Sequence, residues 1–152
     1  MDKDQVKLLT VSGILDSISI LKEEINESKT FISAALKTDD ANIPYKKLEE
    51  IIESLYEKNE SIYNLQIELL KRNYSKELEF NGETYKPIEL LKLKDKLQTD
   101  KEICNLIVEN SEKFQDQETL NLTLETFQKL QQTKKDTSLV FDTLEKYNKG
   151  KI

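Results

Sequence analysis

The residues best suited to binding chemistry lie on either side of an Asn-Gly pair. Arg72 and Asn73 close one apolar-periodic segment, Thr84 follows the Asn-Gly pair, and Lys94 and Asp95 lie in the next segment. An Arg guanidinium forms paired hydrogen bonds with phosphate or carboxylate, and Asn and Thr supply uncharged polar groups. If the chain turns back at Asn-Gly, these side chains meet. We therefore expect a site for a small anion such as a nucleotide, with Arg72 as its anchor.

The same five residues also have a purely structural interpretation. In it, Arg72 forms an ion pair with Asp95, Asn73 caps the end of its helix, and Thr84 supports the turn. The sequence leaves both interpretations open.

The composition excludes several kinds of catalytic site. The chain of 152 residues has no His and a single Cys, so Ser-His-Asp and Cys-His systems and His-ligated metals are ruled out. It also lacks a Gly-rich phosphate loop and an EF-hand calcium loop. Adjacent acidic pairs point in different directions on a helix, so they suit solvated faces better than acid–base chemistry. We expect no enzyme, no metal site and no cofactor.

The charge balance and the Cys content bear on partners and location. Lys and Arg number 23 against 29 Asp and Glu, giving a net charge of −6, which argues against binding to duplex nucleic acid. Cys104 lies on an apolar helical run, so we expect a buried core residue, and a lone Cys suits a reducing compartment. The polar start at Met1 is unlike a signal peptide, and no stretch approaches the ~20 apolar residues of a membrane span. These features predict a cytoplasmic protein.

Helical periodicity dominates the chain. Only three Gly and two Pro are present, too few for a fold of many short strands. Apolar residues spaced by three, four and seven predict helices, and polar turns or Pro separate them. We expect a single all-α domain spanning residues 1–152, an antiparallel bundle or coiled coil of about four helices. The expected helices cover residues 5–36, 44–76, 87–109 and 119–146, with a polar turn at 38–42.

One segment breaks the helical pattern. Asn81-Gly82 stands between short alternating runs, and both central positions of a type I′ turn require a positive φ, which Asn and Gly tolerate. We expect a short β-hairpin there.

The second helix carries a coiled-coil pattern. Leu48, Leu55, Ile62 and Leu69 repeat every seven residues. A companion row begins apolar and becomes polar, with Ile52, Asn59, Gln66 and Asn73. The polar row either turns toward solvent or sets the register of a partner helix. Because such helical hairpins often complete their cores by pairing, we expect a homo-oligomer.

The order of these motifs resembles the septicolysin-like family of small bacterial and phage proteins. In that family a helix ending in Asn leads through a Gly-x-Thr turn to Glu, an apolar pair, a basic-Asp pair and Leu. The matching residues here are Asn73, Gly82, Thr84, Glu89, Lys94, Asp95 and Leu97, followed near the C-terminus by Phe127-Gln128-Lys129, Asp142, Leu144 and Asn148. The chain departs from the family pattern in having Arg72 where Thr is usual and no Trp after the final Asn.

Three functions are compatible with these features. The first is a non-enzymatic, phage-encoded anti-defence protein that captures a small anionic nucleotide signal. The second is an adaptor that binds another protein through its coiled-coil face. The third, cytolysis, is implied by the family name alone.

Overall fold

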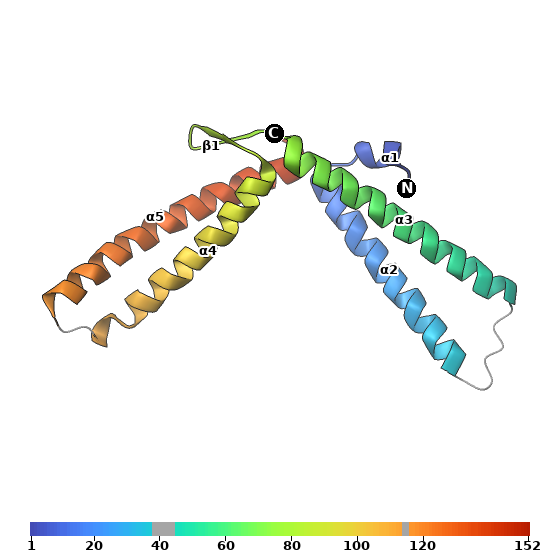
Figure 1. Ribbon diagram of the computed structural model, residues 1–152, viewed down its shortest axis with the longest axis horizontal. Helices are drawn as coiled ribbons and strands as arrows, with labels where there is room; N and C mark the ends of the chain where they lie inside the picture. The colour runs from blue at the N-terminus through green and yellow to red at the C-terminus, as the bar shows by residue number, and fades with distance from the viewer. Residues whose placement is uncertain (38–44, 114–115) are drawn as a thin grey trace. The chain divides into compact units, whose positions relative to one another are not determined.

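The computed structural model describes residues 1–37, 45–113 and 116–152, and it confirms the all-α prediction (Figure 1). Long helices make up most of the chain, with one short β-hairpin between them. The predicted polar turn at 38–42 lies outside the described residues. In chain order the elements are α1 (Lys3–Lys7), α2 (Val11–Lys37), α3 (Tyr45–Ser75), β1 (Leu78–Phe80), β2 (Glu83–Tyr85), α4 (Pro87–Glu109), a 3-10 turn η1 (Ser111–Lys113) and α5 (Gln117–Asn148).

The chain divides into two compact units. The first unit comprises residues 1–72 and 148–150, and the second comprises residues 73–147 and 151–152. In the first unit α2 and α3 run antiparallel with α1 beside them, and in the second unit α4 and α5 run antiparallel (Figure 1). The single domain expected from the even composition stays a prediction, for which one cooperative unfolding transition is the test.

The first predicted helix is interrupted, which the apolar spacing did not indicate. Residues 8–10 separate α1 from α2, because Thr10 starts a new helix. The hydroxyl oxygen of Thr10 accepts a hydrogen bond from the Gly13 N–H at 3.0 Å, and the Thr10 carbonyl accepts one from the Ile14 N–H at 2.9 Å. A Thr side chain that binds an otherwise unpaired N–H is the usual start of a helix. The apolar spacing missed this break because it continues across it.

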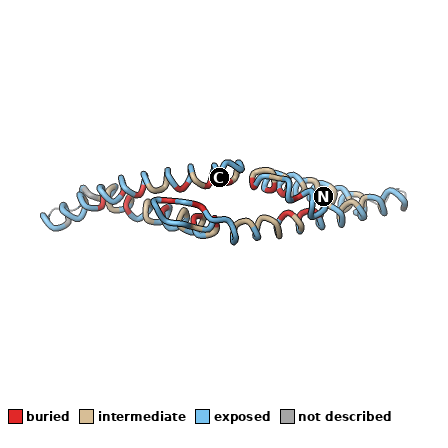
Figure 2. Tube along the Cα trace, turned by 90° about the horizontal axis from the view of Figure 1, so that it is seen from above, coloured by how far each residue is buried: buried red, intermediate tan, exposed pale blue. Residues whose placement is uncertain are grey.

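The core of the first unit lies between α1, α2 and α3. Val6, Ile14, Ile18 and Leu65 form one buried cluster, and Leu9, Leu21 and Leu69 pack against it. The buried positions follow the inner faces of the helices, while most of each helix surface is exposed (Figure 2). One strip of apolar residues per helix therefore holds this unit together, which is the arrangement expected of an amphipathic helical hairpin.

The hairpin has the predicted turn. Asn81 and Gly82 have φ values of 50° and 76°, and the strand register pairs Leu78 with Tyr85 and Phe80 with Glu83. Leu78 and Phe80 are buried, and the Phe80 and Tyr85 rings meet edge to face at 5.9 Å. A two-stranded hairpin is marginal on its own, so this buried side gives it the support it needs.

The second unit packs one face of α4 against one face of α5. Leu90, Leu97 and Cys104 are the buried apolar residues of α4, which confirms the prediction for Cys104. The buried apolar residues of α5 are Leu130, Val140, Leu144 and Tyr147. Helix α5 begins at Gln117, two residues before the predicted start, so its alternating Leu120, Leu122 and Leu124 are helical and remain exposed. No helix in the described ranges is both long and apolar enough to cross a lipid bilayer.

The turn conformation predicts the effect of replacing Gly82. The space around its missing side chain is open, so Gly82→Ala adds no clash and its cost is conformational. A left-handed backbone costs an L-residue about 1–2 kcal/mol, and we expect the free energy of unfolding in urea to fall by this amount. Asn81→Gly is the control, since Gly accepts the same φ. Equal stability of Gly82→Ala and the parent protein would contradict this account of the turn.

Candidate functional site

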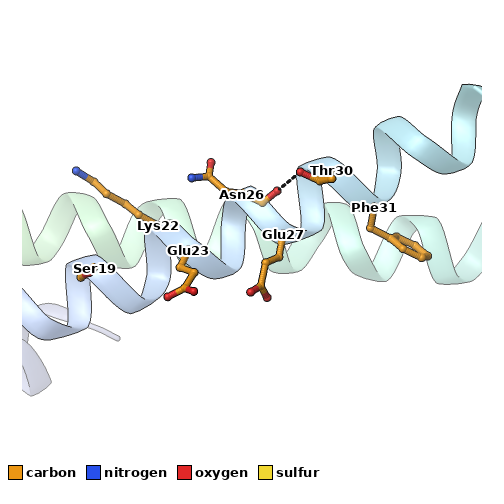
Figure 3. Close-up of a pocket in the computed structure, with 7 residues that line it drawn as sticks. All are labelled: Ser19, Lys22, Glu23, Asn26, Glu27, Thr30 and Phe31. Atoms are coloured by element: carbon orange, nitrogen blue, oxygen red, sulfur yellow. Dashed lines mark hydrogen bonds between the residues drawn. The ribbon is translucent and has the colours of Figure 1, made fainter.

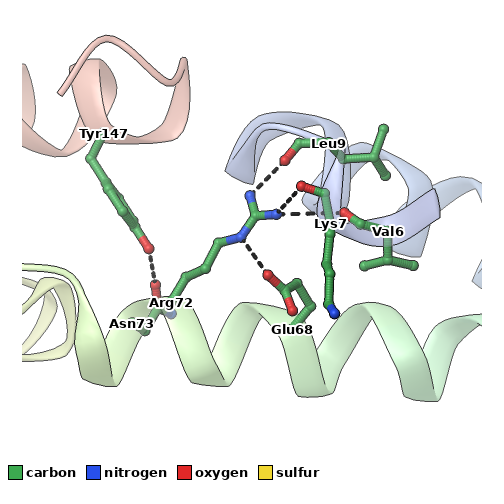
Figure 4. Close-up of polar contacts among 7 residues, drawn as sticks. All are labelled: Val6, Lys7, Leu9, Glu68, Arg72, Asn73 and Tyr147. Carbon is green, nitrogen blue, oxygen red and sulfur yellow. Dashed lines mark hydrogen bonds and ion pairs between the residues drawn. The ribbon is translucent and has the colours of Figure 1, made fainter. Parts of the chain in front are cut away.

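Arg72, the expected ligand anchor, is engaged by its own unit (Figure 4). Its Nε donates to Glu68 Oε1 at 2.9 Å, one turn earlier on α3. The terminal guanidinium nitrogens donate to the backbone carbonyls of Val6, Lys7 and Leu9. The side chains of Arg72 and Glu68 are only 22% and 17% exposed. The planar fork expected to bind an anion is therefore directed at protein oxygens.

The Val6 and Lys7 carbonyls belong to the last turn of α1, and Leu9 follows that turn. The Val6 carbonyl also accepts the Leu9 N–H at 3.1 Å. The last carbonyls of a helix have no partner within it, and a cation near that end is favoured by the helix dipole. Arg72 thus caps α1 from the neighbouring helix. The sequence could not indicate this role, because the break between α1 and α2 that exposes the carbonyls was not itself predicted.

Asn73 makes a contact within the second unit. Its side-chain oxygen accepts a hydrogen bond from the hydroxyl of Tyr147 at 2.9 Å, and Tyr147 is 5% exposed (Figure 4). This hydrogen bond joins the end of α3 to the end of α5. It also gives the buried Tyr147 hydroxyl a partner in place of water. Asn73 is therefore committed to a contact 74 residues away in sequence.

The other three expected site residues are dispersed over the second unit. Thr84 is exposed on β2 opposite Glu79, and Asp95 is exposed on α4. The ammonium of Lys94 lies 4.9 Å from the centre of the Phe141 ring, a cation–π contact. Among the described residues, no hydrogen bond or ion pair joins Asn73, Thr84, Lys94 and Asp95 to one another. The ligand site at these positions stays a prediction.

Several positions of the family-like motif have structural roles. Gly82 occupies the turn, Leu97 is buried, and the Glu89 carboxylate accepts a hydrogen bond from the Lys86 N–H at the start of α4. Beside Thr84, the Tyr85 hydroxyl donates to Glu83, and this hydrogen bond raises the Tyr85 pKa. The motif therefore encodes the hairpin and the first turn of α4.

Comparison of the chain with protein-family models, with curated proteins and with solved structures found no match. The septicolysin-like resemblance accordingly stays a prediction.

Two depressions on the first unit offer little to a nucleotide. One is an open surface on α2 alone, where Lys22 and Asn26 project from one side of the helix and Glu23 and Glu27 from the other (Figure 3). The other is a pocket of about 110 Å³ between α1 and α3, lined by Lys3, Lys7, Tyr63, Asn64, Ile67, Glu68 and Lys71. Ligand pockets usually enclose about 300–1,000 Å³. The smaller pocket also presents the Glu68 carboxylate and a buried Asn64 amide oxygen that has no hydrogen-bond donor in the described part of the chain.

A more prominent feature is an exposed apolar strip along α3, which we call the outer row. Its large residues are strongly exposed: Ile52 at 38%, Tyr56 at 72%, Tyr63 at 55% and Leu70 at 51%. Two exposed amides complete the set, so the outer row is Ile52, Tyr56, Asn59, Tyr63, Gln66 and Leu70. The alternating steps of four and three residues place all six on one helix face.

The outer row includes Ile52, Asn59 and Gln66 of the predicted companion row but not Asn73, and it does not face the core. Inward-facing residues of α3 are offset by one position, with Ser61 and Leu65 buried beside Ile62. Asn59 and Gln66 consequently lie on the surface of the single chain. The sequence pattern did contain the signal, because Tyr56, Tyr63 and Leu70 repeat every seven residues beside the polar row.

The capping role of Arg72 predicts a loss of stability on substitution. Hydrogen bonds to charged groups contribute about 1.5–3 kcal/mol, so Arg72→Ala should lower the free energy of unfolding by about 2–3 kcal/mol. It should also speed amide hydrogen exchange in α1. Arg72→Lys should recover only part of the loss, because Lys keeps the charge without the fork.

Lys58→Ala serves as the matched control. Lys58 pairs with Glu24 at 3.4 Å, with side chains 30% and 43% exposed, and such a pair contributes less than about 1 kcal/mol. If Arg72→Ala were as stable as the parent protein, the capping role would be wrong.

Proposed function

We propose that the protein is a non-enzymatic interaction module that binds a partner helix along the outer row of α3. The observation that carries this proposal is the exposure of four large apolar side chains, from Ile52 to Leu70, on one face of a long helix. Contiguous exposed apolar surface of this kind marks interaction sites, whereas isolated exposed residues do not.

The chemistry of the outer row suits a helical partner. Amphipathic helices engage their targets through anchors at spacings of three, four and seven residues, which are the spacings of the outer row. Tyr is enriched among residues that dominate binding energy, since it combines a large apolar ring with a polar tip. Asn59 and Gln66 add hydrogen-bonding groups between the rings, and amides within a helical seam favour one register over others.

Capture of a small anion is less well supported by the contacts of the expected site. An anion that used Arg72 would have to compete with Glu68 and three carbonyls for the guanidinium. The pocket between α1 and α3, which Glu68 and Lys71 help to line, is small and includes a carboxylate. A partner helix that binds the outer row has neither to displace the Arg72 hydrogen bonds nor to enter this pocket.

A thermal-shift experiment with nucleotides distinguishes the two functions. A ligand present at 100 times its Kd stabilises a protein by about 2.7 kcal/mol, so a specific nucleotide would raise the melting temperature clearly. We expect no rise with mononucleotides or cyclic nucleotides. A rise that is lost in Lys94→Ala, a substitution that leaves the Arg72 hydrogen bonds in place, would instead support the anion site.

Photo-crosslinking tests the interaction module directly. A photoreactive phenylalanine analogue at Tyr63 should form a covalent adduct with a protein in the producing cell, because the ring is exposed in the middle of the outer row. The same analogue at Glu27, on the open surface of α2, is the control and should give no comparable adduct. Absence of any protein adduct from position 63 would reject the proposed function.

A further inference from the structure

Building on the proposed interaction module, we infer that the helix which covers the outer row is α3 of a second copy of this chain, packed antiparallel. In this pair, Glu53 and Glu57 of each copy face the Lys3 and Lys7 side of the other copy.

The outer row is self-complementary when its direction is reversed. Read from residue 52 to residue 70, it runs aliphatic, Tyr, amide, Tyr, amide, aliphatic. An antiparallel copy centred on the middle of the row places Ile52 opposite Leu70, Tyr56 opposite Gln66, and Asn59 opposite Tyr63. Each aliphatic end then meets an aliphatic end, and each Tyr meets an amide that can hydrogen-bond to its hydroxyl.

The charge on α3 is divided between its two halves. Residues 45–60 contain five Glu against three Lys, whereas residues 61–76 contain one Glu against two Lys and one Arg. Glu53 and Glu57 are exposed in the acidic half. Glu53 and Lys71 are 18 residues apart, which is five helical turns, so they lie on the same flank of the helix.

Helix α1 brings Lys3 and Lys7 to the C-terminal half of α3, with Asp2 and Asp4 at the start of α1. Lys3 and Lys7 line the small pocket together with Tyr63 of the outer row and Lys71, so these cations adjoin the C-terminal half of the row. Lys7 also lies 3.9 Å from Asp4, but the Asp4 side chain is 96% exposed and such a pair is weak. Lys3 and Lys7 thus lie beside the part of the row that an antiparallel partner covers with its acidic half.

Electrostatics separates the two orientations. A parallel pair would set the flank that carries Glu53 and Glu57 against the opposite flank of the partner, so these carboxylates would not meet the Lys3 and Lys7 side. An antiparallel pair places acid against base at two equivalent ends, as the two-fold symmetry of an isologous dimer requires. The exception is Glu60, which lies near the symmetry axis and approaches its own copy.

Sedimentation velocity over a wide concentration range tests the inference. The parent protein should dimerise, and Glu53→Lys with Glu57→Lys should raise the dimer Kd about 10-fold, since two attractive ends become repulsive. Lys3→Glu with Lys7→Glu should do the same. Mixing the two double variants should restore dimers of parent affinity, because both ends are again complementary. Glu60→Gln should tighten the dimer by relieving repulsion at the axis.

Glu23→Lys with Glu27→Lys, on the open surface of α2, makes the same charge change outside the surface and should leave the dimer unchanged. Charge reversal at residues 53 and 57 that leaves the dimer intact or tightens it would overturn the antiparallel arrangement. A parent protein that stays monomeric would overturn self-pairing altogether. In that case, an adduct between position 63 and a different protein would still support the proposed interaction module. Failure to form any adduct would contradict both the interaction module and self-pairing.

Discussion

The contact on which the first unit most depends is the Arg72 guanidinium at the end of α1. Helix α1 has only five residues, which is too short to be stable alone in water. It is held by the burial of Val6 and by the hydrogen bonds that Arg72 donates to the Val6 and Lys7 carbonyls at its end and to the Leu9 carbonyl just beyond it. Glu68 balances the charge and orients the side chain. With α1 in place, Val6 completes the apolar cluster that joins α2 to α3.

The position of α1 also shapes the surface of α3. By lying along the C-terminal half of α3, α1 adds Lys3 and Lys7 to a region that already contains Lys71. The N-terminal half of α3 keeps its excess of Glu. A helix with an exposed apolar row and opposite net charges in its two halves is suited to pair with a reversed copy of itself. By holding α1, Arg72 places Lys3 and Lys7 beside one of these halves.

The five residues expected to form a ligand site make different kinds of contact in the structure. Arg72 and Asn73 are adjacent in sequence, yet their side chains bind different units, Arg72 to α1 and Asn73 to Tyr147 of α5. Lys94 lies over an aromatic ring and Thr84 and Asp95 are exposed. The same polar side chain can bind a ligand or form hydrogen bonds with backbone groups. Residue type alone therefore could not distinguish these roles. For Arg72, the end of α1 beside its guanidinium distinguishes the structural role from the ligand-binding role.

The local sequence determined the elements of this protein. Periodic apolar residues specified the long helices, Pro87 specified the start of α4, and Asn81-Gly82 specified the hairpin, since each acts through backbone geometry within a few residues. Only the tertiary structure decided which α3 face is buried. Two adjacent seven-residue rows are both consistent with a helical seam, and the choice between them depends on where α1 and α2 pack. That packing buried Ile62 and Leu65 and left Tyr56, Tyr63 and Leu70 exposed.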